Sequence, residues 1–305
     1  MITNESIYFI TSKTTTTEIG SVGMDIWLAA IAYGAARVLL LVPPAVAASV
    51  VAELKVQLAV SGVILEGMGY PREILRLVRD PDDEQMITEL DATETQFELR
   101  SAGFAGLDEK RTVIRLALDH LFQEAPAPRP LVSLLVVAPF GDVLLDEKRC
   151  TLCMACVSQR PGQALLAGDE RPELGFVEEK CVQCALCASS CPENAIAPTP
   201  RYLYDREARR RRRVLKSEEP LCCIRCGKPF ASRGTVERVI ARLAGHPLFQ
   251  GNGFVDRCLI GIEAHHGSRL TIDAPAGVVG KPPLGVFHSG AQLLGFLPNL
   301  CLVAE

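Results

Sequence analysis

Aromatic residues, histidines and phosphate-binding loops are scarce in this chain of 305 residues. Aromatic side chains make up 6% of it, and none of the five histidines has a partner at a catalytic spacing. No Gly-rich phosphate fingerprint follows a predicted strand, so the sequence carries no nucleotide-binding signal. The net charge of −4 provides no basic field, which argues against a nucleic-acid partner. We therefore expect no enzyme active site and no nucleic-acid interface.

Targeting and membrane signals are also missing from the sequence. Residues 1–17 are rich in threonine and lack the apolar core that a signal peptide needs. The most apolar stretch, residues 26–51, is interrupted by Arg37 and Pro43, whereas a membrane helix needs about 20 nearly unbroken apolar residues. We expect no membrane span. Because cysteines used as metal ligands belong in a reducing compartment, we expect the protein in the cytoplasm.

What the chain has in quantity is cysteine, and seven of the twelve cysteines fall in two runs about thirty residues apart. The runs read Cys150-x-x-Cys153-x-x-Cys156 and Cys181-x-x-Cys184-x-x-Cys187-x-x-x-Cys191-Pro192. The second run has the spacing of a bacterial [4Fe–4S] loop. Structural zinc sites usually take two pairs of ligands instead, and inert buried thiols do not repeat at a fixed spacing. The cysteine spacing therefore predicts iron–sulfur clusters.

The ligands of each predicted cluster follow from the way in which tandem cysteine runs exchange ligands. In a two-cluster module the fourth cysteine of each run ligates the cluster of the other run. Cluster one would then take Cys150, Cys153, Cys156 and Cys191. Cluster two would take Cys181, Cys184 and Cys187, because Arg160 occupies the missing fourth position. We expect one [4Fe–4S] cluster. For cluster two we keep open a [4Fe–4S] cluster, a [3Fe–4S] cluster and an empty site.

Periodicity around the runs predicts the fold class. Similar short segments follow both runs, residues 162–166 and 193–197, and they indicate an internal duplication with a βαββαβ ferredoxin-like order. Upstream, apolar strands alternate with helices, which implies right-handed crossovers and a parallel sheet. We expect strands at 6–11, 37–42 and 73–78, and helices at 20–36, 45–67 and 111–122.

The predicted chain is an α/β N-terminal domain with a small parallel sheet, an α+β two-cluster ferredoxin-like module and a poorly defined C-terminal region. The Pro-rich segment 125–130 predicts a stiff connector after the first domain. The expected boundaries are 1–124 for the α/β domain, 125–138 for a linker and strand, 139–200 for the two-cluster domain, 201–250 for a basic connector with a Cys-x-x-Cys-Gly region, and 251–305 for an uncertain tail.

Two features beyond the cysteine runs carry weaker predictions. The arginine run 209–213 predicts a solvated helix face or connector, with a docking patch for an acidic redox partner as the alternative. Cys223-Ile-Arg-Cys226-Gly is typical of half a zinc site, which Cys258 with His265 or His266 could complete. Alternatively, a cysteine of the segment 222–226 ligates cluster two, or these thiols bind nothing.

Residues 141–249 are similar to the C-terminal half of multi-cluster ferredoxin-type proteins encoded beside bacterial formate dehydrogenases. The segments that carry the resemblance are Cys181-Val-Gln-Cys184, Cys191-Pro-Glu-Asn194 and Glu218-Glu-Pro-Leu-Cys-Cys-Ile-Arg-Cys-Gly-Lys-Pro-Phe230. Residues 20–42 resemble the delta-subunit domain of methyl-viologen-reducing hydrogenases, a small α/β electron-transfer domain. Here Ser21 stands where that family has a [2Fe–2S] cysteine, and Cys258 is alone where the first family has a second Cys-x-x-Cys.

Together these patterns predict an iron–sulfur electron-transfer protein or subunit. The resemblance implies that it passes electrons between a dehydrogenase or carrier and other redox centres, with formate dehydrogenase or a hydrogenase-like protein as the partner. An alternative from another class is an iron–sulfur or zinc-bearing sensor or assembly module. A degenerate remnant of such a carrier is the third interpretation.

Overall fold

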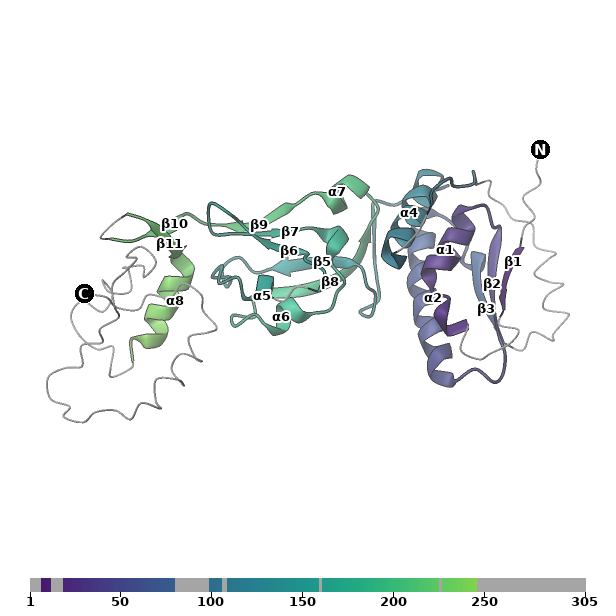
Figure 1. Ribbon diagram of the computed structural model, residues 1–305, viewed down its shortest axis with the longest axis horizontal. Coiled ribbons are helices and arrows are strands. Elements are labelled where there is room, and N and C mark those ends of the chain that lie inside the picture. Colours follow the sequence, from purple (N-terminus) through teal and green to yellow (C-terminus); the bar gives the residue numbers. More distant parts are fainter. Residues whose placement is uncertain are drawn as a thin grey trace. The chain divides into compact units, whose positions relative to one another are not determined.

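The computed structural model divides the chain into two units, whose elements are labelled in Figure 1. The first unit consists of residues 1–142 and 199–210, and the second of residues 143–198 and 211–305. The structure describes residues 7–11, 19–79, 99–105, 109–158, 161–224 and 227–245. The predicted tail, 251–305, lies outside these residues, and so do Arg160, Cys226 and Cys258.

A small parallel sheet in the order β1-β2-β3 forms one layer of the first unit, as the strand–helix alternation predicts. Its central strand begins and ends at the predicted residues, and five of its six residues are buried because both faces of the strand are covered. The elements are β1 (Ile7–Thr11), η1 (Ile19–Ser21), α1 (Met24–Ala32), β2 (Arg37–Val42), α2 (Ala48–Met68), η2 (Arg72–Ile74), β3 (Leu75–Arg79), α4 (Lys110–Gln123) and β4 (Leu131–Ser133).

Helices α1, α2 and α4 supply the other layer of this core. Trp27 of α1, Ile64 of α2 and Leu121 of α4 are fully buried in one apolar cluster with β2. Helix α2 is the one described helix long and apolar enough to cross a membrane by length and composition alone. Its face with Ile64 and Leu65 packs in the core, and core helices of globular proteins share this composition.

The Pro-rich segment 125–130, predicted from its composition to be a stiff connector, is hydrogen-bonded to the end of α2. The amide of Ala127 donates to the carbonyl of Met68 at 3.0 Å, and the amide of Arg129 donates to the carbonyl of Gly67 at 2.8 Å. The carbonyl groups at the end of α2 need such partners, since no further helical turn follows them. The segment therefore belongs to the first unit and closes the end of α2.

The second unit contains both cysteine runs. Strands β6, β7 and β9 form an antiparallel sheet, and a further sheet has the order β4-β8-β5, with the unit boundary inside β5 and β8. The elements from β5 onward are β5 (Gly141–Leu145), α5 (Ala155–Ser158), β6 (Leu165–Ala167), β7 (Glu173–Phe176), η3 (Glu178–Lys180), α6 (Leu186–Ser189), β8 (Ile196–Leu203), α7 (Arg206–Arg210), β9 (Arg213–Ser217), β10 (Pro220–Cys222), β11 (Pro229–Ser232) and α8 (Arg233–Leu243).

The duplication expected from the sequence is present in the backbone. Non-glycine residues with positive φ are uncommon, and the described residues contain six of them, which form three pairs 31 residues apart. The pairs are Leu152 with Gln183, Met154 with Ala185, and Gln163 with Asn194. Two hydrogen bonds between the halves follow the same relation: Asp146 N to Ala195 O, and Val177 N to Ala164 O, both 2.8 Å. The two loops thus share one backbone conformation.

Residues 210–213 of the arginine run are exposed, as expected for a solvated face or connector, and the buried Arg209 is the exception. Arg209 is 4% exposed; its guanidinium pairs with Asp119, donates to the carbonyls of Leu203 and Tyr204, and lies over the ring of Tyr202. In the second unit the guanidinium of Arg212 pairs with Glu173 at 2.6 Å. The charge of Arg209 is therefore compensated inside the first unit, and the docking patch for an acidic redox partner stays a prediction for residues 210–213.

We expect Asp119→Ala to destabilise the first unit. The side chains of Asp119 and Arg209 are 12% and 5% exposed, so the substitution leaves a buried guanidinium without its carboxylate. Removing one partner of a buried ion pair costs about 3 kcal/mol of the free energy of unfolding. Urea unfolding followed by circular dichroism measures the loss. Arg211→Ala, at an exposed position of the same run, is the control and should leave the midpoint unchanged.

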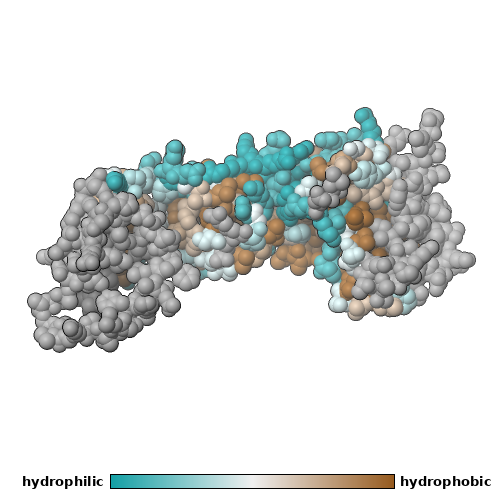
Figure 2. Space-filling model, in the orientation of Figure 1, coloured by the Kyte–Doolittle hydropathy of each residue, from teal (hydrophilic) through white to brown (hydrophobic). Residues whose placement is uncertain are grey.

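On the described surface visible in Figure 2, hydrophilic residues gather along the upper part and hydrophobic residues lie below them. Large apolar side chains that are exposed include Val136 and Val137 in the first unit, and Leu144 and Val214 in the second. Scattered apolar residues of this kind are normal on globular proteins. The surface therefore does not identify a binding site, and the cysteine runs remain the chemically informative feature.

Candidate metal centre

A tight turn places the first cysteine run. The carboxylate of Asp146, just after β5, accepts hydrogen bonds from the amides of Lys148 and Arg149 at 3.0 and 3.2 Å. The carbonyl of Asp146 then accepts from the amide of Cys150 at 3.0 Å. Aspartate stabilises turns of this type because its side chain reaches the backbone amides that follow it. The run is thus fixed at its first cysteine before it enters α5.

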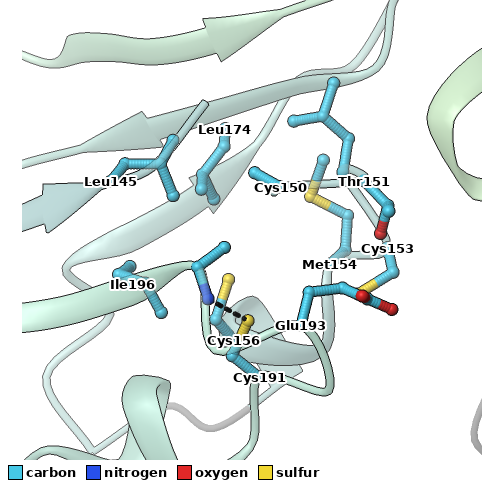
Figure 3. A pocket seen from close by; sticks show the side chains of 12 residues that line it. Leu145, Cys150, Thr151, Cys153, Met154, Cys156, Leu174, Cys191, Glu193 and Ile196 are labelled. Carbon is cyan, nitrogen blue, oxygen red and sulfur yellow. Dashed lines mark hydrogen bonds between the residues drawn. The ribbon is translucent and has the colours of Figure 1, made fainter. Parts of the chain in front are cut away.

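The four thiols predicted for cluster one line a single pocket. Cys150, Cys153 and Cys156 come from the first run, and Cys191 arrives from the second. Figure 3 shows these cysteines around the pocket, with Cys156 and Cys191 close together. The other walls are mostly apolar and include Leu145, Leu174 and Ile196. The structure therefore brings together thiols from both halves of the duplication, which is the arrangement that the tandem-run rule requires.

Backbone and burial adapt these thiols to a cluster. The amide of Ala195 donates to the sulfur of Cys191 at 3.3 Å, the dashed line in Figure 3. Hydrogen bonds to cluster sulfurs are one of the means by which a protein sets the reduction potential. Burial, and to a lesser extent the neighbouring thiols, raise the pKa of the Cys156 thiol to about 12. Such a thiol stays protonated until a metal ion displaces the proton from its sulfur, so iron binding would release protons here.

The spacing of the thiols favours a cluster over a single ion. Around one zinc ion all four sulfurs sit about 2.3 Å from the same centre. Across the described ranges, no three residues among His, Cys, Asp and Glu converge closely enough to hold one metal ion. In a cubane each thiolate bonds to a different iron, so the sulfurs stand farther apart around a larger body. The number and sequence spacing of the four cysteines that line the pocket, three from one run and one from the other, are those of such a cluster.

The three thiols predicted for cluster two also lie near one another. Burial raises the pKa of the Cys187 thiol, and the adjacent Cys181 and Cys184 raise it further. The side-chain amide of Gln183 donates to the sulfur of Cys181 at 3.3 Å. The fourth position, Arg160, lies outside the described residues, so the structure does not test what stands there. The ligand set of cluster two stays a prediction.

The proposed half zinc site is only partly described. Cys222 is exposed and Cys223 is buried. The amide of Gly227 donates to the carbonyl of Cys223 at 2.8 Å, and Gly227 has a φ of +71°, which glycine adopts without strain. This is the tight turn expected behind such a pair. Cys226, Cys258, His265 and His266 lie outside the described residues, so zinc binding stays a prediction.

Sequence reasoning missed the residues that support the loop of cluster one from outside the runs. Lys216 of β9 donates to the carbonyls of Cys150 and Glu147 at 2.5 and 2.8 Å. The hydroxyls of Ser232 and Thr235 both donate to the carbonyl of Thr151, at 2.6 and 2.8 Å. A Ser-x-x-Thr pair before a helical pattern could have indicated an N-cap. Nothing in the sequence could have indicated its partner, more than eighty residues upstream.

Comparison with known proteins agrees with the second run. Residues 175–197 match the family described as 4Fe-4S binding domain (Fer4), and this segment includes Cys181, Cys184, Cys187 and Cys191. No curated protein matches the chain. The match and the cysteine spacing together indicate at least one [4Fe–4S] cluster, and therefore an iron–sulfur protein with an electron-transfer role.

Proposed function

We propose that this protein is an electron carrier, or an electron-transfer subunit of an oxidoreductase, built on a two-cluster ferredoxin-like module and without a substrate-converting active site of its own. The observation that carries the proposal is the pocket that Cys150, Cys153, Cys156 and Cys191 line within a duplicated backbone. Ligands drawn from both halves tie the two loops to one centre. Such an arrangement suits a cluster whose surroundings must change little when an electron arrives.

The residues of the chain have separate tasks in this function. A bound [4Fe–4S] cluster supplies reversible one-electron oxidation and reduction. The four thiolates hold it, and the amide of Ala195 places a hydrogen-bond donor on a ligand sulfur. Leu145, Leu174 and Ile196 exclude water from one side of the pocket, which lowers the local dielectric constant and so shapes the potential.

For the second site we propose a labile or three-iron cluster held by Cys181, Cys184 and Cys187. Two features support it. The backbone of this loop repeats that of the first loop at every left-handed position, so the thiols have the same local geometry. The guanidinium at Arg160 cannot act as the fourth ligand, because it carries a positive charge at any accessible pH.

The partner we propose is a redox protein in the cytoplasm, such as a formate dehydrogenase or a hydrogenase-like enzyme. The support is the resemblance of residues 141–249 to ferredoxin-type proteins encoded beside formate dehydrogenases, together with the cysteine usage typical of a reducing compartment. Anaerobically purified protein mixed with candidate dehydrogenases and an artificial acceptor would test this. Transfer that depends on the clusters supports the assignment to a carrier.

A redox titration of the reconstituted protein tests the proposed function. We expect a wild-type signal that is reduced and reoxidised reversibly, monitored by EPR and visible absorption. A cluster that assembles but decomposes on reduction would favour the sensor or assembly alternative, since a carrier must survive every cycle. Protein that binds zinc and takes up no iron would contradict the proposal, and failure to load either metal would favour the remnant.

A further inference from the structure

Contacts from the C-terminal part of the second unit gather on the loop of cluster one. Ser232 and Thr235, at the start of α8, hold the carbonyl of Thr151. Arg238 and Arg242, farther along the same helix, pair with the carboxylate of Glu193 at 3.3 and 3.0 Å. Glu193 lies two residues after a ligand of cluster one, so both segments that bring ligands to this cluster are anchored to α8.

Lys216 is a cation in direct contact with the backbone of a ligand residue in this loop. Its ammonium group donates to the carbonyl of Cys150 at 2.5 Å, and its side chain is 13% exposed. The carboxylate of Glu218 lies 2.7 Å away and also accepts from the amide of Gly234 at 3.4 Å. The ammonium group of Lys216 and the carboxylate of Glu218 are therefore held beside cluster one, and partial burial limits the screening of their charges by salt.

The duplication does not extend to Lys216, which lies on β9 outside the two repeated halves. Strand β9 pairs with β7 and sets Lys216 opposite Leu174, which lines the pocket of cluster one. The counterpart of β7 in the first half is β5, which is an edge strand among the described residues. The counterpart of Glu193 is Gly162, where a Cβ atom would approach the carbonyl of Lys180 to 2.3 Å. The surroundings of the two clusters differ although their loops match.

We propose that Lys216 is a positioning residue that sets the reduction potential of cluster one, with Glu218 opposing it. This inference rests on the proposed electron-transfer function. Reduction adds one negative charge to the cluster, and a nearby cation stabilises the reduced form, so Lys216 raises the potential. The carboxylate of Glu218 acts in the opposite direction.

The test compares one variant that removes the positive charge with one that removes the negative charge. EPR-monitored titrations of the full-length protein are compared for wild type, Lys216→Met, Lys216→Arg and Glu218→Gln. The signal that is absent from Cys153→Ala is assigned to cluster one. At a fixed applied potential we expect Lys216→Met to lower the ratio of reduced to oxidised cluster by roughly tenfold, the size of one partly screened charge. Tenfold corresponds to about 59 mV for one electron.

The other variants separate charge from scaffolding. Glu218→Gln should raise that ratio, and Lys216→Arg should keep it near the wild-type value. Lys228→Met removes an exposed lysine from the same unit and is the control for net charge. If Lys216 and Glu218 only hold the loop together, Lys216→Met and Glu218→Gln shift the potential in the same direction, and the inference is overturned. Unchanged potentials in both variants overturn it as well.

Two further outcomes are also decisive. If Lys216→Met fails to load its cluster, Glu218→Gln decides alone: a higher potential supports the inference, and an unchanged or lower one overturns it. A wild type that does not cycle reversibly defeats the proposed function and the inference with it. If the wild type cycles reversibly but neither Lys216→Met nor Glu218→Gln changes the reduction potential, only the inference is overturned.

Discussion

Cys153→Ala is expected to lose about four irons per chain, the content of one cubane cluster. Cys153 stands in the middle of the first run and lines the pocket where the four predicted thiols meet. Without it cluster one keeps three protein thiolates, the number available to cluster two, so we expect it to become labile and to lose its iron on gel filtration. Iron and sulfide analysis of anaerobically reconstituted protein measures the change, and EPR identifies which signal disappears.

The chain offers matched controls for this substitution. Cys222→Ala removes an exposed cysteine outside both runs and should leave the iron content unchanged. Cys184→Ala removes the counterpart of Cys153 in the second run, and it should spare the signal that Cys153→Ala abolishes. An unchanged iron content and EPR spectrum in Cys153→Ala would contradict the pairing of Cys191 with the first run.

Arg160→Cys is expected to raise the iron content to about eight per chain, the content of two cubanes. The reason is the repeated backbone: among the described residues, Met154 and Gln163 have the same left-handed conformation as their counterparts Ala185 and Asn194 in the loop that carries Cys191, with φ values of 51° for Gln163 and 46° for Asn194. A thiolate at residue 160 would therefore complete cluster two. In the wild type we expect a three-iron EPR signal, or iron that is lost on gel filtration. Mössbauer spectra before and after the substitution distinguish these states.

Gln159→Cys is the control for Arg160→Cys, because it adds a thiol one residue away from the ligand position. It should leave the iron content at the wild-type value. Equal gains from both substitutions would point to adventitious iron. If the wild type already holds two stable four-iron clusters and Arg160→Cys adds nothing, our assignment of an open ligand position to cluster two is incorrect.

Part of the fold could be predicted from short-range pattern alone. The run Arg-Val-Leu-Leu-Leu-Val predicted β2 at its observed bounds, since a short, continuous apolar run with β-branched residues suits a strand buried on both faces. Helix ends were less accurate: α1 spans Met24–Ala32, inside the predicted 20–36. The composition of the Pro-rich segment 125–130 could not predict its hydrogen bonds to the terminal carbonyls of α2, because those partners lie about sixty residues upstream.

By itself the sequence determined which thiols are available, their spacing and the duplication, because each is a property of neighbouring residues in the chain. A fixed cysteine spacing dictates a loop geometry, and the loop geometry dictates the type of metal centre. Tertiary structure alone decided that Arg209 is buried against Asp119 and that Lys216 contacts the loop of cluster one. These contacts join residues 90 and 66 positions apart. Strand register and helix packing determine which residues Arg209 and Lys216 contact, and no local pattern of charge encodes either.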